Sequence, residues 1–331
     1  MAVDDRHRLE SVLKQHLATL GHGNVELMGH EVMAGGASGA RAFRLRCREG
    51  VLFLKVVAAV APWGLVERAR REIMFHRELA SDLPIRVPEM IASRCERDEP
   101  ALLLLEGLDP VEWSDARHLE AARILGQLHA RFWGKERELT AMPWLRRADV
   151  PESTGIPDAI RAWQRLRADA AAHRLLSEER YRGIIAMLHA LDGDCIDEPS
   201  MPVTLVHGDF HAGNILSDAD DNLVVVDWQE ARLGQGPEDL SFYLQRAAFP
   251  VDLGIPEDRM IAEYRRSLVE GLGYDVPERD IRRVMAAAEL RTRLLHWPTF
   301  LIGATEPQLE HHLARIERCA ATLGLALTSR S

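Results

Sequence analysis

Alternating apolar and polar residues mark the first third of the chain and predict β-strands. The segments RAFRLRC and VLFLKVV alternate on either side of the short turn REG, which is typical of a hairpin. Two further strands are expected in VPEMIASRCERDEPALLLLEGL, where a charged turn precedes the apolar run Leu102–Leu105. Between these pairs, WGLVERARREIMFHRELASDL carries apolar residues at helical spacing. The pattern predicts an antiparallel sheet interrupted by one helix.

After Trp113 the spacing of apolar residues changes to that of amphipathic helices. Ser114 is a candidate N-cap for the first of them, SDARHLEAARILGQLHARFWG, which ends at Gly134. We expect an α+β protein whose sheet region covers residues 1–105 and whose mainly helical region covers residues 106–331. The further helices predicted are Ile156–Ala172, Ser177–Leu191, Glu238–Ala248, Glu257–Leu272, Glu278–Thr292 and Gln308–Leu323.

Two segments between residues 205 and 228 break the helical pattern. The first reads LVHGDFHAGNIL, in which an apolar run leads into a loop that contains Asp209 and Asn214. The second, VVVDW, delivers Asp227 at the end of another apolar run. DADDN lies between them and is a cluster of turn residues, so NILS and NLVVVDW are expected to form a hairpin. This hairpin would bring Asn214 and Asp227 to the same end.

The order and spacing of these residues favour phosphoryl transfer. An Asp followed five residues later by an Asn, and then by a second Asp after a strand, is typical of kinase catalytic loops. A hydroxyl that attacks a phosphoryl group needs a proton acceptor, and Asp209 is the candidate base. Asn214 and Asp227 offer oxygen ligands for Mg²⁺.

A metal-dependent hydrolase is the main rival interpretation of the same segment. His207 and His211 are four residues apart with Asp209 between them, as metal ligands on a helix would be. Gly208 and Gly213 disfavour a helix there, and no HExxH motif follows. His207 alone is better explained as a structural histidine of the loop.

The complete set of motifs resembles the aminoglycoside phosphotransferase and choline kinase-like family. HGDFHAGN followed by VDWQEARLGQGPEDL matches the three parts of that family's pattern in order. The resemblance implies a two-lobed, protein-kinase-like fold with an antiparallel-sheet N-terminal lobe and a mainly helical C-terminal lobe. It also implies that Asp209 is the base, that Asn214 and Asp227 hold the metal, and that His207 and Asp239 support the catalytic loop.

The N-terminal region supplies candidates for a nucleotide site. Glycine-rich loops approach phosphates closely, and GGASG lies between two predicted strands, although it also suits an ordinary hairpin. Lys55 lies within an apolar strand, where an unpaired ammonium is costly, so a carboxylate partner is expected. By resemblance Lys55 contacts the α- and β-phosphates and is held by Glu72, with Glu67 and Glu78 as alternatives. The loop residues proposed for nucleotide binding are Gly35, Gly36, Ser38 and Gly39.

The segment after Leu105 resembles the hinge between the lobes of that family. There the main-chain groups of Glu106 and Leu108 would pair with the edge of a purine. Because main-chain groups do not reveal which base they read, both ATP and GTP remain open.

Composition and charge narrow the possible partners. The chain has 331 residues with 28% charged residues and a net charge of −10. Residues 1–105 hold 15 basic and 14 acidic residues, whereas the rest hold 26 and 37. This acidity disfavours a nucleic acid and leans toward a cationic acceptor. Scattered cysteines without a CxxC pair, and no apolar run long enough for a membrane span or signal peptide, predict a cytoplasmic protein.

The short path from Asp227 to Asp239 favours a small acceptor. Only nine residues separate Asp227 from Pro237, which leaves no room for the peptide-docking segment of protein kinases. The aromatic cluster of His296, Trp297 and Phe300 could contact such an acceptor, although a place in the core is commoner.

We therefore expect a Mg²⁺-dependent O-phosphotransferase that uses ATP or GTP. Its acceptor would be a small-molecule hydroxyl, with an antibiotic or other natural product as the leading candidate. A metabolite kinase that acts on an amino alcohol, a sugar or a sterol-like alcohol is the alternative. A nucleotide-binding pseudokinase is the alternative from another class. The oligomeric state is not predicted.

Overall fold

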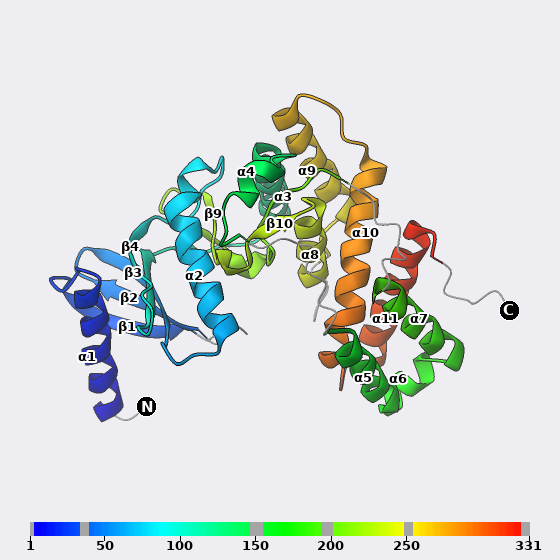
Figure 1. Cartoon of the computed structure of the whole chain (residues 1–331), viewed down its shortest axis with the longest axis horizontal. Coiled ribbons are helices and arrows are strands. Elements are labelled where there is room, and N and C mark those ends of the chain that lie inside the picture. Colours follow the sequence, from blue (N-terminus) through cyan, green and yellow to red (C-terminus); the bar gives the residue numbers. More distant parts are fainter. Residues whose placement is uncertain (1–2, 34–39, 146–154, 193–200, 248–253, 326–331) are drawn as a thin grey trace. The chain divides into compact units, whose positions relative to one another are not determined.

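The computed structural model describes residues 3–33, 40–145, 155–192, 201–247 and 254–325, which form two compact units (Figure 1). Unit 1 comprises Met1–Trp113, Pro143–Leu145 and Gly213–Ala231. Unit 2 comprises Ser114–Met142, Arg146–Ala212 and Arg232–Ser331. The chain therefore leaves unit 2 after Ala212 and returns to it at Arg232. The lobe boundary expected after residue 105 stays a prediction.

Five strands form the main sheet within the described part of unit 1, and all their pairings are antiparallel. The predicted hairpin is present, because β2 and β3 pair from Arg41↔Val56 to Cys47↔Gly50. The strands lie in the order β1-β2-β3-β5-β4. Their bounds are β1 Leu27–Met33, β2 Arg41–Cys47, β3 Gly50–Val57, β4 Met90–Arg94 and β5 Ala101–Glu106.

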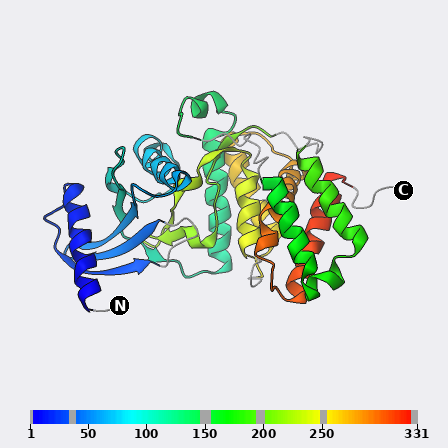
Figure 2. The ribbon, with the colours of Figure 1, turned by 60° about the horizontal axis from the view of Figure 1, so that its bottom comes forward.

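A helix covers each face of this sheet because successive strand residues point to opposite sides. Leu54 of β3 packs with Leu13 and Leu17 of α1 (Val3–Thr19), so one face is closed by α1. On the other face, Leu103 of β5 packs with Ile73 of α2 (Trp63–Glu78). Figure 2 shows the sheet with α1 beside it. Helix α2 lies where the helical spacing predicts it, whereas α1 lies in a segment for which no helix is predicted.

The predicted hairpin around residues 215–225 is also present in unit 1. β8 (Ile215–Ser217) pairs with β9 (Leu223–Val225), and β8 also pairs with β6 (Asp109–Pro110). Asp218 closes the turn, because its carboxylate accepts hydrogen bonds from the amides of Asp220 and Asn222 at 3.0 and 2.9 Å. Turn chemistry thus fixes the register of this hairpin.

Unit 2 is mainly helical, as predicted. Its two short strands, β7 (Thr204–Val206) and β10 (Arg232–Gly234), pair with each other. The first predicted helix is α3, and the Ser114 side chain accepts a hydrogen bond from the Arg117 amide, as an N-cap does. The helices are α3 Asp115–Phe132, α4 Glu136–Thr140, α5 Gly155–Ala168, α6 Ala170–Leu175, α7 Glu178–Asp192, α8 Pro237–Ala247, α9 Glu257–Leu272, α10 Glu278–Leu295 and α11 Glu306–Leu323. Short 3-10 turns occur in both units, at Ala80–Asp82, Ala212–Asn214, Trp228–Glu230 (η3) and Trp297–Thr299.

The helix boundaries required three corrections. The single helix predicted over residues 156–172 is broken at Asp169, whose carboxylate accepts a hydrogen bond from the Ala172 amide and so begins a new helix. Helix α10 runs one turn past Thr292, and α11 begins two residues before Gln308 in a capping box with Thr305. The short α4 was not predicted.

Helices α3 and α9 pack closely because glycines lie at their contact. A Cβ atom on Gly126 of α3 would come within 2.6 Å of the Ser267 side chain and 2.7 Å of the Tyr264 carbonyl oxygen. A Cβ on Gly271 of α9 would lie 2.5 Å from Ala130. Both distances are too short for ordinary packing, so this approach of the two helices requires glycine at both positions.

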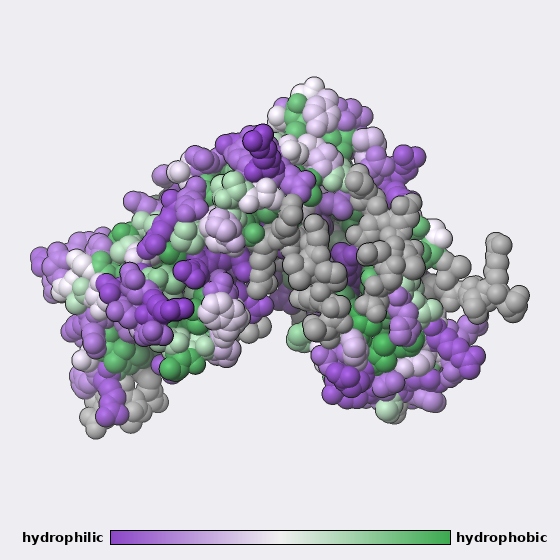
Figure 3. All heavy atoms as spheres, in the orientation of Figure 1, coloured by the Kyte–Doolittle hydropathy of each residue, from purple (hydrophilic) through white to green (hydrophobic). Residues whose placement is uncertain are grey.

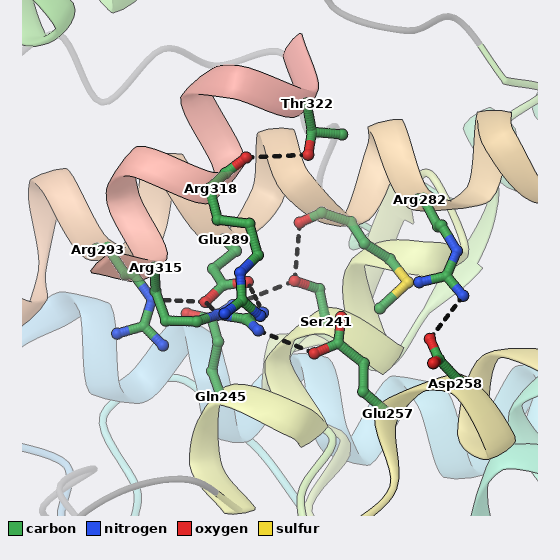
Figure 4. Close-up of polar contacts among 11 residues, drawn as sticks. Ser241, Gln245, Glu257, Asp258, Arg282, Glu289, Arg293, Arg315, Arg318 and Thr322 are labelled. Atoms are coloured by element: carbon green, nitrogen blue, oxygen red, sulfur yellow. Dashed lines mark hydrogen bonds and ion pairs between the residues drawn. The ribbon is translucent and has the colours of Figure 1, made fainter. Parts of the chain in front are cut away.

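A buried ion cluster joins α9, α10 and α11 (Figure 4). Glu289 of α10 accepts hydrogen bonds from Arg293 at 2.6 Å and from Arg315 of α11 at 2.8 Å. Arg315 also pairs with Glu257 of α9 at 2.8 Å. Burial alone would raise the pKa of Glu289, but the two guanidinium groups outweigh burial and lower it. The Glu289 carboxylate is therefore kept charged inside the helical core.

Polar residues dominate the face of the molecule drawn in Figure 3, with hydrophobic residues scattered among them. Large apolar side chains that are exposed include Trp63 in unit 1 and Phe300 in unit 2. Within the described residues, no helix is both long and apolar enough to cross a membrane.

Candidate active site

Lys55 is the centre of an ion triad in unit 1. Its ammonium donates to both carboxylate oxygens of Glu72, at 2.7 and 2.9 Å, and to Asp227 at 2.8 Å. The carboxylate partner expected for a lysine inside an apolar strand is therefore present, and it is the predicted Glu72 of α2. The alternatives bind elsewhere, since Glu67 pairs with Arg70 and Glu78 accepts from Trp144. Asp227 as a second partner was not predicted.

Burial and charge act in opposite directions on this triad. Burial by itself would lower the pKa of Lys55, but the adjacent charges of Glu72 and Asp227 outweigh it and raise the pKa. Burial raises the pKa of Glu72 despite the neighbouring ammonium, and the charge of Asp227 adds to that rise. Two carboxylates around one ammonium leave a formal excess of negative charge. Such an excess suits a divalent cation.

Asp227 lies in a left-handed turn that aims its side chain at Lys55. Its φ of 67° and ψ of 60° are unusual for a residue other than glycine. The turn continues into η3, and Trp228 is fully buried against Phe75 of α2, with ring centroids 4.1 Å apart and planes within 10° of parallel. Arg71 of α2 also donates to the Gln229 carbonyl. Helix α2 therefore holds both Glu72 and the turn that carries Asp227.

Asn214 and Asp227 lie at the same end of the β8–β9 hairpin. The Val226 amide donates to the Asn214 carbonyl oxygen at 3.0 Å, which extends the pairing of Ile215 with Val225 by one step. One amide and one carboxylate are hard oxygen donors of the kind that Mg²⁺ prefers. Among the residues that the structure describes, no group of three or more His, Cys, Asp or Glu is placed to hold a metal ion.

A hollow of about 320 Å³, open to solvent, adjoins the triad in unit 1. Lys55 and Glu72 provide its charged wall. Apolar side chains form most of the rest of the wall, namely Ala40, Val57, Leu65, Ala69, Ile73, Ala101 and Leu103, together with Gln229. Its enclosed part has room for about one water molecule, and the rest is open to solvent.

The segment after β5 is tied to the start of β3. The Gly107 amide donates to the Val51 carbonyl at 2.9 Å, and a Cβ on Gly107 would lie within 2.6 Å of the Val51 backbone. The Glu106 side chain accepts from the Glu89 amide and pairs with Arg86. The contacts expected from the main chains of Glu106 and Leu108 stay a prediction. The loop residues Gly35, Gly36, Ser38 and Gly39 lie outside the described residues.

In unit 2, Asp239 at the start of α8 binds the backbone of the loop that follows β7. The buried Asp239 carboxylate accepts from the His207 amide at 2.7 Å and from the Gly208 amide at 2.9 Å. Gly208 has a φ of +82°, which glycine adopts without strain. The His207 ring in turn accepts from the Asp209 amide at 3.2 Å. His207 and Asp239 are thus both hydrogen-bonded to the backbone of residues 207–209, and their support of a catalytic loop stays a prediction.

The Asp209 side chain is partly exposed and lies near a second histidine of the loop. His211 Nε2 is 3.8 Å from Asp209 Oδ1, and the Asp209 side chain keeps 30% of its surface open to solvent. A carboxylate of this kind can accept a proton from a bound hydroxyl group.

Two further predicted residues, His296 and Trp297, follow α10. Trp297 is buried in the core of unit 2, and the Arg293 guanidinium lies 5.4 Å from its ring centroid. His296 is exposed, as is Phe300. Their contact with an acceptor stays a prediction.

Asp239 also has partners on neighbouring helices that were not predicted. His129 of α3 lies with its Nε2 3.3 Å from Asp239 Oδ2 and its Nδ1 3.0 Å from the hydroxyl of Tyr264 of α9. Both residues are fully buried. The available signal was a histidine on the apolar stripe of a predicted helix, because a buried imidazole needs polar partners.

Comparison with known proteins gives one family match. The model of the "phosphotransferase enzyme family" matches residues 30–288. A search of curated proteins found no significant match.

Solved structures share the fold at low identity. The macrolide 2′-phosphotransferase from Brachybacterium faecium is 18% identical, with a TM-score of 0.57 over 95% of this chain and 97% of that one. The complex of the aminoglycoside phosphotransferase APH(2″)-IIIa with GDP and kanamycin is 12% identical, with a TM-score of 0.57 over 93% and 98%. A putative fructosamine-3-kinase from Haemophilus somnus is 13% identical, with a TM-score of 0.56 over 93% and 96%. The predicted fold class is confirmed.

Proposed function

Because this chain belongs to the phosphotransferase enzyme family, we propose that it transfers the γ-phosphoryl group of ATP or GTP to a hydroxyl of a small molecule, with Mg²⁺. The observation that carries the proposal is the ion triad of Lys55, Glu72 and Asp227 beside an apolar hollow. A triad of this kind supplies a fixed ammonium for nucleotide phosphates and a carboxylate for their metal ion.

Each residue has a distinct role in the proposed reaction. Lys55 binds the α- and β-phosphates, and Glu72 keeps its ammonium in place. Asp227 and Asn214 hold Mg²⁺, which when bound offsets the negative charge of the phosphates. Asp209 accepts the proton of the acceptor hydroxyl while the oxygen forms a bond to the γ-phosphorus. The bond from the γ-phosphorus to the β–γ bridging oxygen breaks, and the nucleoside diphosphate leaves.

Further contacts with the nucleotide are proposed for the segment after β5 and for the glycine-rich loop. The main chains of Glu106 and Leu108 would bind the purine, and the loop with Gly35, Gly36, Ser38 and Gly39 would cover the phosphates. The GDP complex of the aminoglycoside phosphotransferase supports a purine nucleotide as co-substrate. The assay below compares ATP and GTP as phosphoryl donors.

An antibiotic or other natural product is the proposed acceptor. Macrolide and aminoglycoside phosphotransferases share the fold, which supports this class. The exposed His296 remains a candidate acceptor contact, whereas Trp297 belongs to the core of unit 2. The putative fructosamine-3-kinase has the same fold and supports a metabolite such as a sugar derivative as the second candidate.

One assay tests the reaction and its base. Purified protein is incubated with Mg²⁺, ATP or GTP, and a panel of macrolides, aminoglycosides, amino alcohols, sugars and fructosamines. We expect one acceptor class to be phosphorylated, and Asp209→Asn to reduce kcat by about 10²–10⁴-fold with nucleotide binding unchanged. Full activity in Asp209→Asn would disprove the base assignment. If neither nucleotide raised the melting temperature, the chain would not be the proposed enzyme.

A further inference from the structure

Strand β1 lies at one end of the main sheet, and its outer edge is unpaired within the described residues (Figure 1). The strand order β1-β2-β3-β5-β4 leaves two such edges, at β1 and at β4. An edge strand turns backbone N–H and C=O groups outward, and these groups can pair with a further strand. The two edges of this sheet differ in how they treat that possibility.

The edge at β4 is closed by polar contacts. Arg77 of α2 donates to the Ser93 hydroxyl at 3.1 Å and to the Ser93 carbonyl oxygen at 3.2 Å, so this backbone acceptor already has a partner. Arg94 pairs with Glu99 at 2.6 Å and adds two charged groups. Charged side chains of this kind commonly block an edge.

The edge at β1 carries apolar side chains instead. Met28 keeps 67% of its surface exposed, Val32 keeps 51% and Met33 keeps 38%. The strand LMGHEVM contains one acidic residue, Glu31, and none of the lysine or proline residues that commonly protect an edge. This edge is therefore suited to pairing.

The irregular part of β1 is confined to its start. The register with β2 shifts between Leu27 and Gly29, and from Gly29 to Met33 each residue has one partner on β2. A bulge protects an edge by twisting it away from a neighbour, and here most of the strand lies beyond it. Residues 29–33 therefore form a regular outer edge.

Two opposite charges lie on one face of this edge. Gly29 pairs with Arg46 of β2, and Glu31 lies two residues further along β1, so their side chains belong to the same face of the sheet. Arg46 reaches over Gly29, because a Cβ there would lie 3.1 Å from its Nη2. Arg46 and Glu31 are exposed, and neither forms an ion pair among the described residues. Arg44, which lies opposite Glu31, is already paired with Asp109.

We propose that two copies of this chain associate through β1, which pairs with itself in antiparallel orientation around His30. In this register Glu31 of each copy lies opposite Gly29 of the other, on the face where the second copy's Arg46 reaches toward the edge. The twofold symmetry forms this contact between opposite charges twice. A register around Glu31 itself would set two like charges side by side, which is unfavourable.

The same register also covers the exposed apolar residues. Met28 of each copy lies opposite Val32 of the other, so both side chains leave water. Two paired strands of seven residues cover a small area, and small interfaces are typical of reversible association. The pairing does not depend on the proposed reaction.

Sedimentation velocity of the full-length protein at about 1–100 μM tests the association. We expect the sedimentation coefficient to rise with concentration from that of a monomer toward that of a dimer. Glu31→Arg and Arg46→Glu each place like charges across the edge and should keep the protein monomeric. The double variant exchanges the two charges and should restore the dimer. Glu99→Arg, at the β4 edge, is the control and should behave like the wild type.

A disulfide across the symmetry axis tests the register. Residues directly opposite each other in antiparallel strands have Cα atoms about 4.5–5.5 Å apart, which a disulfide can bridge. Under mild oxidation His30→Cys should therefore form a covalent dimer on a non-reducing gel. Val32→Cys is the control, because the two copies of Val32 would be separated along the strands, and the wild type controls for the native cysteines.

Three results would overturn the proposal. The first is a wild type that stays monomeric over the whole concentration range. The second is a dimer that neither Glu31→Arg nor Arg46→Glu weakens, because its interface would then lie elsewhere. The third is a covalent dimer of Val32→Cys that forms as readily as that of His30→Cys.

Discussion

At the scale of single residues, the triad around Lys55 is the feature with the largest expected effect on nucleotide binding. We expect Lys55→Met to abolish the rise in melting temperature that MgATP or MgGTP causes in the wild type. The buried carboxylate of Glu72 and the half-buried carboxylate of Asp227 would lose their shared cation and repel both each other and the phosphates. Differential scanning fluorimetry with and without nucleotide measures this change.

Lys14→Met is the control for that variant. Lys14 lies on the exposed side of α1 and pairs with Glu10 in the same unit, so the same substitution removes only a surface charge. The Lys14 variant should respond to nucleotide like the wild type. An undiminished nucleotide response in Lys55→Met would argue against the phosphate-binding role.

His76 is expected to make the stability of the protein depend on pH. Both ring nitrogens are buried and have no hydrogen-bond partner, and burial with the nearby charge of Lys55 lowers the pKa of His76 to about 4. Between pH 4 and 6.5 the unfolded chain therefore binds more protons at this site than the folded chain does. Stability falls as the pH decreases through that range, by about 2 kcal/mol from this residue at pH 5.

Replacing His76 with an apolar residue tests this effect. His76→Leu removes the titrating group and the unsatisfied nitrogens, so it should raise the melting temperature at pH 5 more than at pH 7.5. Thermal unfolding at both pH values provides the comparison. Equal shifts at the two pH values would show that His76 does not carry the pH dependence.

Residues whose chemistry depends on local sequence could be predicted, and those that depend on tertiary partners could not. The need of Lys55 for a carboxylate followed from its place in an apolar strand, and the helical stripe of α2 made Glu72 the candidate. Its second partner, Asp227, lies 172 residues away in sequence, and no local pattern connects them. The hydrogen bonds of His129 could not be predicted, because the apolar spacing of α3 does not identify a buried polar contact.

At the scale of elements, the contact between helix α2 and turn η3 links the two carboxylates of the triad. Phe75→Leu would remove the stacking on Trp228 and loosen the turn that places Asp227. We expect a stability loss of about 1–2 kcal/mol and a higher Mg²⁺ concentration at half-maximal activity. A titration of activity with Mg²⁺ at saturating nucleotide measures the second effect.

Phe132→Leu gives the matched loss of a buried phenyl ring in unit 2. Phe132 is fully buried on α3, so the variant should lose comparable stability without a change in Mg²⁺ dependence. The same Mg²⁺ shift in both variants would mean that the turn responds to general destabilisation rather than to α2.

Elements were predictable where one pattern continued without interruption. The hairpin from Arg41 to Val57 and helix α9 followed directly from alternation and helical spacing. Helix α1 was not predicted, although Leu9, Leu13 and Leu17 repeat every four residues and form the stripe that packs on the sheet. The break at Asp169 depends on one side chain that caps the next helix, and the helical spacing continues through it.

At the scale of the whole molecule, the ion cluster around Glu289 is expected to limit the stability of unit 2. Glu289→Gln leaves Arg293 and Arg315 buried without their shared carboxylate, and breaking a buried pair in this way costs about 3–5 kcal/mol. Glu317→Gln is the control, because Glu317 is on α11 and pairs with Arg180 near the surface. Thermal and urea unfolding of both variants would show the difference, and equal losses would contradict a special role for the buried cluster.

We expect the same ion cluster to make the stability of the protein fall in acid. The pKa of Glu289 is lower in the folded than in the unfolded protein, so its stabilising effect is present above the unfolded value and lost as the pH falls through the folded one. The stability of the wild type should therefore start to approach that of Glu289→Gln as the pH falls below the ordinary glutamate pKa of about 4.3, and the two should meet below the lowered pKa of the folded protein. A difference between them that persists at lower pH would contradict this.

The fold class followed from the order of strand and helix patterns, together with the motifs between residues 205 and 240. The division into units could not be derived in the same way. A stretch of the late chain, Gly213–Ala231, belongs to the unit that contains the first sheet, and no composition change marks its ends. This stretch belongs to unit 1 because of contacts between residues far apart in sequence, such as Trp228 stacked on Phe75.

Because residues 213–231 complete unit 1, this unit lacks part of its contacts for some time during synthesis on the ribosome. Lys55 is synthesised long before Asp227, and at a usual elongation rate the delay is on the order of 10–30 s. During this time Lys55 has no Asp227 to pair with, and the surface of α2 that later covers Trp228 stays exposed. The first 113 residues therefore cannot complete their own charge balance, and a fragment cut there would keep an unfilled place for the hairpin that follows.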